Sequence, residues 1–131
     1  MKVRLLLVDD HDDARTTLVQ RLRRDARLQL VGAASTLEEA ARLLPDARPD
    51  IVLLDIHGHD GRGVEACRAL RQLTDAPVVV FTSYVTPALW RAAKEAGAAD
   101  YLFKHVDTDR LSKAIVRLAE RLGRIGVGRR G

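Results

Sequence analysis

The chain has few residues of several types, and each shortage narrows its class. Cys67 is the only cysteine among 131 residues, so no internal disulfide can form and a reducing compartment is the natural setting. Aromatic residues make up 4% of the sequence, which leaves few side chains on which nucleic-acid bases could stack. The first apolar run ends at Asp9, too early for a signal-peptide core, and no run approaches the ~20 residues of a membrane-spanning helix. We therefore expect a cytoplasmic protein that does not enter a membrane.

The length and charge of the chain point to one domain. At 131 residues and 47% hydrophobic, it can bury a single core. We expect this domain to cover residues 1–122, and the glycines and arginines of residues 123–131 predict a flexible basic tail. The formal net charge is +4, but the arginines that produce it are spread along the chain, and we do not expect direct nucleic-acid binding.

Short apolar runs alternate with amphipathic stretches along the sequence. The runs are VRLLLV (3–8), LQLVGAA (28–34), IVLL (51–54), VVVF (78–81) and YLF (101–103). Successive runs begin about 25 residues apart, the length of one strand, one three-turn helix and two loops. Helix starts are indicated at Thr36, at Thr86 before Pro87, and at Asp107, and Gly97 is typical of a left-handed helix end.

This alternation predicts an α/β fold with a parallel sheet covered by helices on both faces. For five strands and five helices, the common doubly wound order is 2-1-3-4-5, which reverses direction between strands 1 and 3. Ligands of such sheets bind at the carboxyl ends of the strands near that reversal. The polar residues that end the apolar runs should therefore share one edge; they are Asp9, Asp10, Asp55, Thr82 and Lys104.

Three carboxylates at one edge would repel each other unless a cation or a proton neutralised them. A magnesium ion is the expected neutraliser, because it takes oxygen ligands, keeps several waters and often joins one or two carboxylates to a phosphate. Lys104 and Thr82 would add a positive charge and a hydroxyl donor toward phosphoryl oxygens. Asp55 stands alone at its strand end, and we expect it to be the nucleophile while Asp9 and Asp10 hold the metal.

On these residues the chain resembles the receiver domain of two-component response regulators. The matching motifs are LLLVDDH (5–11), PDIVLLDI (49–56), PVVVFTS (77–83) and AGAADYLFK (96–104). The resemblance covers about the first 120 residues and implies a flavodoxin-like (CheY-like) fold. The VDDH opening is similar to the subgroup with a helix-turn-helix output, and no such output domain occurs in these 131 residues.

The resemblance also implies a role for each matching residue. The residues matching Asp9 and Asp10 bind Mg2+ together with Asp55 and the backbone carbonyl of His57. The residue matching Asp55 takes a phosphoryl group from a histidine kinase or a phosphotransfer protein, and the lysine matching Lys104 contacts that group. The domain then assists its own phosphorylation and dephosphorylation and is not otherwise an enzyme.

Two further residues are implied to report phosphorylation. In the family, the hydroxyl matching Thr82 and the aromatic residue matching Tyr101 move together. This movement reshapes the face made by the fourth helix, the fifth strand and the fifth helix, to which we expect a downstream protein to bind. Homodimer formation on phosphorylation remains an alternative use of this switch.

Two loops depart from the family pattern. The lysine is usually followed by a proline in a cis peptide, but His105 stands here, and we expect a trans Lys104–His105 bond because cis costs roughly 2.5–4 kcal/mol before a non-proline residue. The loop after Asp55 usually holds a methionine-proline pair, with an aspartate or asparagine before the glycine that matches Gly63. Here it reads HGHDGRG, and its three glycines predict greater mobility.

Several alternatives remain open at this stage. The altered loops could mark a degenerate receiver that binds its partner without phosphorylation. A magnesium-dependent phosphatase could use the same aspartyl chemistry, although such enzymes generally need a second acid-base carboxylate and a cap domain. A nucleic-acid binder could use the arginines of residues 21–27 with the basic tail.

The charged residues near this edge also have simpler interpretations. Asp12 and Asp13 favour the dipole of the first helix, and we interpret them as residues of its N-terminus. All four histidines fall in loops at this edge; they are His11, His57, His59 and His105. They could bind a transition metal, but nothing in the sequence fixes their geometry, and we favour the magnesium interpretation.

Overall fold

The computed structural model describes residues 2–55, 62–83 and 85–126, and all structural statements below concern these ranges. Within them, five strands alternate with five helices. The strands are β1 (Val3–Val8), β2 (Leu28–Ala34), β3 (Ile51–Asp55), β4 (Val78–Thr82) and β5 (Ala98–Phe103). The helices are α1 (Asp12–Arg23), α2 (Leu37–Ala47), α3 (Arg62–Leu73), α4 (Pro87–Glu95) and α5 (Thr108–Arg121). None of the described helices is long and apolar enough to cross a bilayer.

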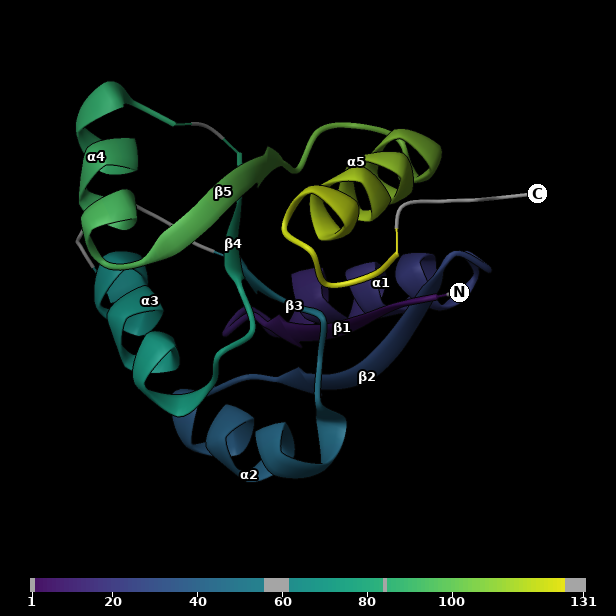
Figure 1. Ribbon diagram of the computed structural model, residues 1–131, viewed down its shortest axis with the longest axis horizontal. Coiled ribbons are helices and arrows are strands. Elements are labelled where there is room, and N and C mark those ends of the chain that lie inside the picture. Colours follow the sequence, from purple (N-terminus) through teal and green to yellow (C-terminus); the bar gives the residue numbers. More distant parts are fainter. Residues whose placement is uncertain (1, 56–61, 84, 127–131) are drawn as a thin grey trace.

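The strands form one parallel sheet in the order β2-β1-β3-β4-β5, as the sequence predicts. The strand order changes direction between β1 and β3, which are hydrogen-bonded parallel neighbours. The chain adds β2 on one side of β1 and adds β3, β4 and β5 on the other. Figure 1 shows α1 and α5 on one face of this sheet and α2, α3 and α4 on the other. The expected α/β doubly wound fold with five helices is therefore confirmed.

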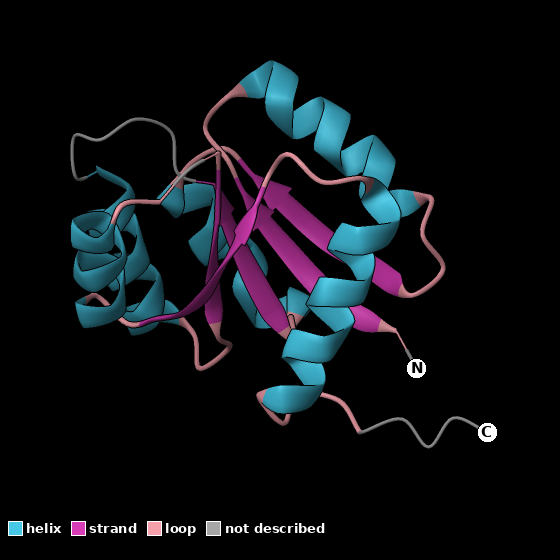
Figure 2. Cartoon of the chain, turned by 90° about the horizontal axis from the view of Figure 1, so that it is seen from above, coloured by secondary structure: helices cyan, strands magenta, loops and turns pink. Residues whose placement is uncertain are grey.

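Alternating residues of each strand pack into two separate cores. Along β1, Leu5 and Leu7 pack with residues of α1 and α5, whereas Leu6 and Val8 pack with residues of α2, α3 and α4. Each of the three central strands is covered on both faces, which explains why their sequences are continuously apolar rather than alternating. Figure 2 shows the sheet enclosed between these two helical layers.

The helix starts follow the local signals in the sequence. The Thr36 hydroxyl caps α2 by accepting a hydrogen bond from the Glu39 N–H (3.0 Å), and the Glu39 carboxylate accepts one from the Ser35 N–H (2.7 Å). Thr86 caps α4 in the same way, with Pro87 in its first turn, and Asp107 caps α5. These side chains satisfy N–H groups that have no partner within the helix.

The start of α1 differs in one detail. Asp12 and Asp13 lie in its first turn, where they favour the helix dipole as expected, but His11 is the capping residue. Its Nδ1 accepts a hydrogen bond from the Ala14 N–H at 3.3 Å. The imidazole therefore takes the place of the usual hydroxyl or carboxylate cap.

The residues just beyond α5 still contact the rest of the domain. Gly123 has a positive φ of 71°, and the Arg124 N–H donates to the Ala119 carbonyl at 2.8 Å, the backbone pattern that closes many helices. Ile125 then packs against the core on the α1 and α5 face. The predicted boundary at residue 122 lies within this closing turn, and residues 127–131 of the predicted tail lie outside the described ranges.

Candidate functional site

The carboxyl ends of four strands place polar residues along one edge of the sheet. Val8 of β1 pairs with Leu54 of β3, so Asp9 and Asp55 follow at the same level. Asp55 lies opposite Phe81, next to Thr82, at the end of β4, and Thr82 pairs with the residue before Lys104. The parallel register therefore gathers the polar groups at the edge that the strand order predicts.

The side chains of Asp55 and Lys104 form an ion pair at this edge. The Asp55 side chain is 2% exposed and the Lys104 side chain 16%, so water screens the pair only weakly. The Lys104 N–H also donates to the Thr82 carbonyl at 2.9 Å, which anchors the backbone of the lysine to β4. The Lys104–His105 bond is trans, as expected from the absence of proline.

Burial determines the protonation of Asp55. It is the largest cause that raises the pKa of this carboxyl, and the neighbouring Asp9 carboxyl acts in the same direction, so that the net pKa is about 6. The Lys104 ammonium acts in the opposite direction, because a nearby positive charge favours the carboxylate. At neutral pH Asp55 is therefore mostly ionised, but it is held as a more basic carboxylate than one in water.

The two residues of the acidic pair have different environments. Asp9 is 1% exposed, and its Oδ1 accepts the His11 N–H at 2.9 Å, while the Arg15 guanidinium donates to the Asp9 carbonyl at 2.9 Å. These contacts fix Asp9 in the loop after β1. Asp10, the next residue, is exposed and faces a cavity that it shares with Asp55.

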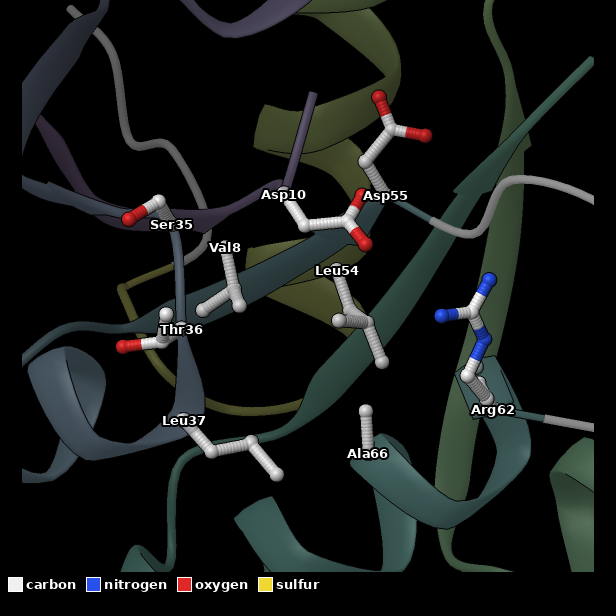
Figure 3. Close-up of a pocket in the computed structure, with 10 residues that line it drawn as sticks. Val8, Asp10, Ser35, Thr36, Leu37, Leu54, Asp55, Arg62 and Ala66 are labelled. Carbon is white, nitrogen blue, oxygen red and sulfur yellow. The ribbon is translucent and has the colours of Figure 1, made fainter. Parts of the chain in front are cut away.

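This cavity has a volume of about 210 Å³ and lies between the ends of β1 and β3 and the starts of α2 and α3. Figure 3 shows Asp10 and Asp55 at one end and Ser35 with Thr36 on one wall. Val8, Leu54 and Ala66 line its apolar part. Arg62 lies opposite Ser35 and Thr36, with its guanidinium directed toward the end that holds the carboxylates.

The donor set suits a hard cation that keeps part of its water. Asp10 and Asp55 both line the same space, and the Asp9 carboxyl is the electrostatic neighbour of Asp55. Within the described ranges no three acidic, imidazole or thiol side chains gather into a ready-made metal cage. Two carboxylates with water in the remaining positions fit Mg2+ better than zinc. His57, whose carbonyl is an expected ligand, lies outside the described residues.

An aromatic series connects α4 to the edge strand β5. The ring of Tyr101 meets Trp90 edge-on at a centroid distance of 4.9 Å, and it meets Phe103 at 5.4 Å. Trp90 is partly buried against the core, as expected of a packing residue, whereas Phe103 is 45% exposed. Tyr101 is thus held between two rings that belong to different elements of the predicted switch face.

Some residues of the site were not found from the sequence. Ser35 and Thr36 follow β2, and the rule that strand ends share an edge could have included them, but their helix-capping role was the more prominent signal. Arg62 had no such signal, because it follows a loop whose path the sequence does not determine. Arg15 was also missed, since it contacts Asp9 through the backbone carbonyl and not through the carboxylate.

The comparisons with known proteins agree with this geometry. Residues 5–116 match the response regulator receiver domain family, and the chain belongs to that family. It is therefore a regulatory domain of two-component signal transduction rather than a conventional enzyme.

Two curated relatives show the same domain within longer proteins. The chain is 38% identical over 114 residues to the DNA-binding transcriptional activator DevR/DosR of Mycobacterium tuberculosis, covering 86% of this chain and 52% of that protein. It is 32% identical over 114 residues to the transcriptional regulatory protein LiaR of Bacillus subtilis, covering 86% of this chain and 54% of that protein. The chain thus spans about half the length of these relatives.

Solved structures have the same fold. A two-component response regulator of the LuxR family from Aurantimonas sp. SI85-9A1 is 33% identical, with a TM-score of 0.77 over 92% of this chain and 87% of that chain. The response regulator domain of Thermotoga maritima CheB is 20% identical, with a TM-score of 0.72 over 97% of this chain and all of that chain (100%), and it supports the fold alone.

Proposed function

We propose that this receiver accepts a phosphoryl group on Asp55 from the phosphohistidine of a histidine kinase or a phosphotransfer protein. The observation that carries the proposal is the buried ion pair between Asp55 and Lys104, beside the carboxylate of Asp10. A purely structural aspartate would gain nothing from a raised pKa and an adjacent acidic residue. A nucleophile that exchanges a carboxylate for an acyl phosphate needs a cation next to it.

The transfer requires few protein groups. A carboxylate oxygen of Asp55 attacks the phosphorus, the bond from phosphorus to the donor imidazole breaks, and its electron pair returns to the ring nitrogen. Lys104 and the Thr82 hydroxyl meet the phosphoryl oxygens, which carry the negative charge. Mg2+ held by Asp9, Asp10, Asp55 and the His57 carbonyl supplies further positive charge when bound. The same groups would stabilise the attack of water that later removes the phosphoryl group.

The phosphorylated state would be read at the face made by α4, β5 and α5. Phosphorylation adds negative charge that Lys104 and Thr82 must meet, and a shift of Thr82 frees space into which Tyr101 can turn. On this face, a groove of about 370 Å³ runs along β5 and α5, lined by Tyr101, Phe103 and Val106 among others. A groove with an exposed phenylalanine suits a protein partner, and a second copy of the chain is the alternative occupant.

The wider setting follows from the relatives. Both curated relatives described above are transcriptional regulators, and in this proposal the receiver controls an output of that kind, inside the cytoplasm, through protein contacts rather than by binding DNA itself. In this proposal the receiver unit is residues 1–122, and residues 123–131 form a basic extension whose first residues close α5 and pack against the core.

The experiment is phosphorylation by acetyl phosphate in Mg2+, followed by intact mass, for the wild type and Asp55→Ala. We expect one phosphoryl adduct on the wild type, its loss when Mg2+ is removed with a chelator, and none on the variant. A wild-type protein that stays folded and gains no adduct would contradict the proposal and favour a receiver that works without phosphorylation.

A further inference from the structure

The turn between β5 and α5 carries Lys104, whose ammonium pairs with Asp55. Residues 104–107 form this turn, and no proline occurs among them. The Lys104–His105 bond is trans and His105 is exposed, so neither a proline ring nor burial of that side chain restrains the backbone after the lysine. Because the ammonium sits on a flexible four-carbon stem, its position depends on how firmly the backbone that carries it is held.

The backbone of this turn is held at two points. At its start, the Lys104 N–H donates to the Thr82 carbonyl at 2.9 Å. Two residues later, the Val106 carbonyl accepts a hydrogen bond from Nη2 of Arg21 at 3.1 Å. Only His105 lies between the two anchored residues, so the two contacts together fix the direction in which the chain leaves Lys104.

Arg21 reaches the turn from the last turn of α1, which lies with α5 on the same face of the sheet (Figure 1). Its Nε donates to the Thr108 hydroxyl oxygen at 3.0 Å, so one planar guanidinium joins the residues on either side of Asp107, the cap of α5. Arg21 is half-buried, which reduces the competition from water for these charge-assisted hydrogen bonds.

Resting on the proposed function, we infer that Arg21 is a positioning residue for phosphoryl transfer: it holds the Val106 carbonyl and, through the turn, fixes the ammonium of Lys104 beside Asp55. Both of its contacts are with the turn and the start of α5, so it acts through Lys104. Without Arg21 the turn would sample other conformations, and the ammonium would meet the phosphoryl oxygens in only a fraction of them.

Replacing Arg21 with glutamine tests this role, because glutamine is shorter and uncharged. The rate of adduct formation with acetyl phosphate in Mg2+, followed by intact mass, should fall about 10-fold, less than the fall of about 10²-fold expected when the Lys104 ammonium itself is removed. Arg21→Lys keeps the charge but offers one nitrogen in place of the two that hold the turn. Its rate should lie between those of the wild type and Arg21→Gln.

Combining Arg21→Gln with Lys104→Met separates positioning from a general loss of structure. If Arg21 acts through Lys104, the change at Arg21 has no further effect once the ammonium is gone. The double variant should therefore react at the rate of Lys104→Met alone.

The matched control is Arg27→Gln. Arg27 joins the loop before β2 to α5 through Asp109 at 2.9 Å, so its removal also breaks a link to α5 but leaves the turn after Lys104 untouched. This variant should keep the wild-type rate. Urea unfolding establishes that each variant is folded and how much stability it loses.

The outcomes separate this inference from the function on which it rests. A wild-type rate in Arg21→Gln contradicts the positioning role and leaves Asp55 as the phosphoacceptor; if that variant does not fold, Arg21→Lys takes its place in the same comparison. An equal fall in Arg27→Gln contradicts the role, since lost stability would then be the cause. A further fall in the double variant also contradicts it, because Arg21 would then act independently of Lys104. If the folded wild type gains no adduct, the proposed function itself is wrong.

Discussion

The ammonium group of Lys104, just beyond β5, forms an ion pair with the carboxylate of Asp55 at the end of β3, across the end of the intervening strand β4. The sheet order brings together two side chains that lie far apart in the sequence. Because Asp55 is buried and Lys104 is largely shielded from water, the pair holds a positive charge next to the position that phosphoryl oxygens would occupy in the proposed transfer.

Replacing Lys104 with methionine should slow phosphorylation of Asp55 by about 10²-fold, because one preorganised cation at the phosphoryl group is lost. The measurement is the rate of adduct formation with acetyl phosphate in Mg2+. Lys94→Met is the control, since Lys94 lies on α4 about 6.0 Å from the Trp90 ring and away from the sheet edge. A Lys104→Met protein that reacts at the wild-type rate would exclude Lys104 from the transfer.

Asp55→Asn should stabilise the protein at pH 7.5 in the absence of Mg2+. Burial raises the pKa of Asp55 to about 6, so the folded state favours the neutral form. The stability that comes from holding Asp55 in its neutral form is complete below the pKa of Asp55 in the unfolded chain, about 4. It is lost as the pH rises through the pKa in the folded protein, about 6. We expect the variant to gain about 1–2 kcal/mol at pH 7.5, and the difference to shrink at pH 5.

Urea unfolding at the two pH values measures this difference. Asp75→Asn, an exposed change of the same charge, should show no such pH dependence. Added Mg2+ should reduce the advantage of Asp55→Asn, because the metal stabilises the ionised wild type. An advantage that is equal at pH 5 and pH 7.5 would show that ionisation of Asp55 is not its cause.

Trp90, the only tryptophan in the sequence, should report the switch through its fluorescence. Its ring lies 4.9 Å from that of Tyr101, so turning Tyr101 inward would expose Trp90 to water and shift its emission to longer wavelength. Addition of beryllofluoride with Mg2+, a stable mimic of the phosphoryl group, tests this without a kinase. Asp55→Ala should abolish the shift and Tyr101→Leu should reduce it; an unchanged shift in Tyr101→Leu would contradict the coupling.

Asp25→Asn should destabilise the protein at pH 7 by about 1 kcal/mol. Hydrogen bonds from the Arg27 side chain, at 2.7 and 2.9 Å, hold the pKa of Asp25 well below its usual range, and Arg27 also reaches Asp109 at the start of α5. A lowered pKa gives stability that is complete above the pKa of the group in the unfolded chain. This stability is lost as the pH falls through the pKa in the folded protein.

The cost of Asp25→Asn should therefore narrow as the pH falls below about 4. Urea unfolding at pH 7 and pH 3 measures the change, with Asp12→Asn as the control, because the Asp12 side chain is 83% exposed. A cost that is the same at both pH values would mean that the introduced amide simply packs less well than the carboxylate it replaces.

The sequence predicts the fold because its local signals agree with each other. Continuous apolar runs, capping residues such as Thr36 and Asp107, and spacings that suit right-handed crossovers all favour the same sheet. The strand ends then determine that Asp9, Asp55 and Lys104 share an edge. β5 begins earlier than predicted, at Ala98, because Ala98 and Asp100 gain pairing with β4 that their own propensities do not favour.

What the sequence could not predict depends on side-chain direction and on loops. The cavity that joins Ser35, Thr36 and Arg62 to Asp55 exists only once α2 and α3 have packed against the sheet. The cap by His11 depends on one imidazole nitrogen reaching the Ala14 N–H, although His is not a favoured capping residue. The hydrophobic periodicity of the sequence predicts the helices and strands but not these contacts.

The most direct test of the central claim is to locate the phosphoryl group by residue. Protein treated with acetyl phosphate and Mg2+ is reduced with borohydride, which converts an aspartyl phosphate into homoserine, and the peptides are sequenced by tandem mass spectrometry. The account predicts homoserine at position 55 alone, and none without Mg2+. Homoserine at position 9 or 10, or an adduct with unmodified Asp55, would contradict it.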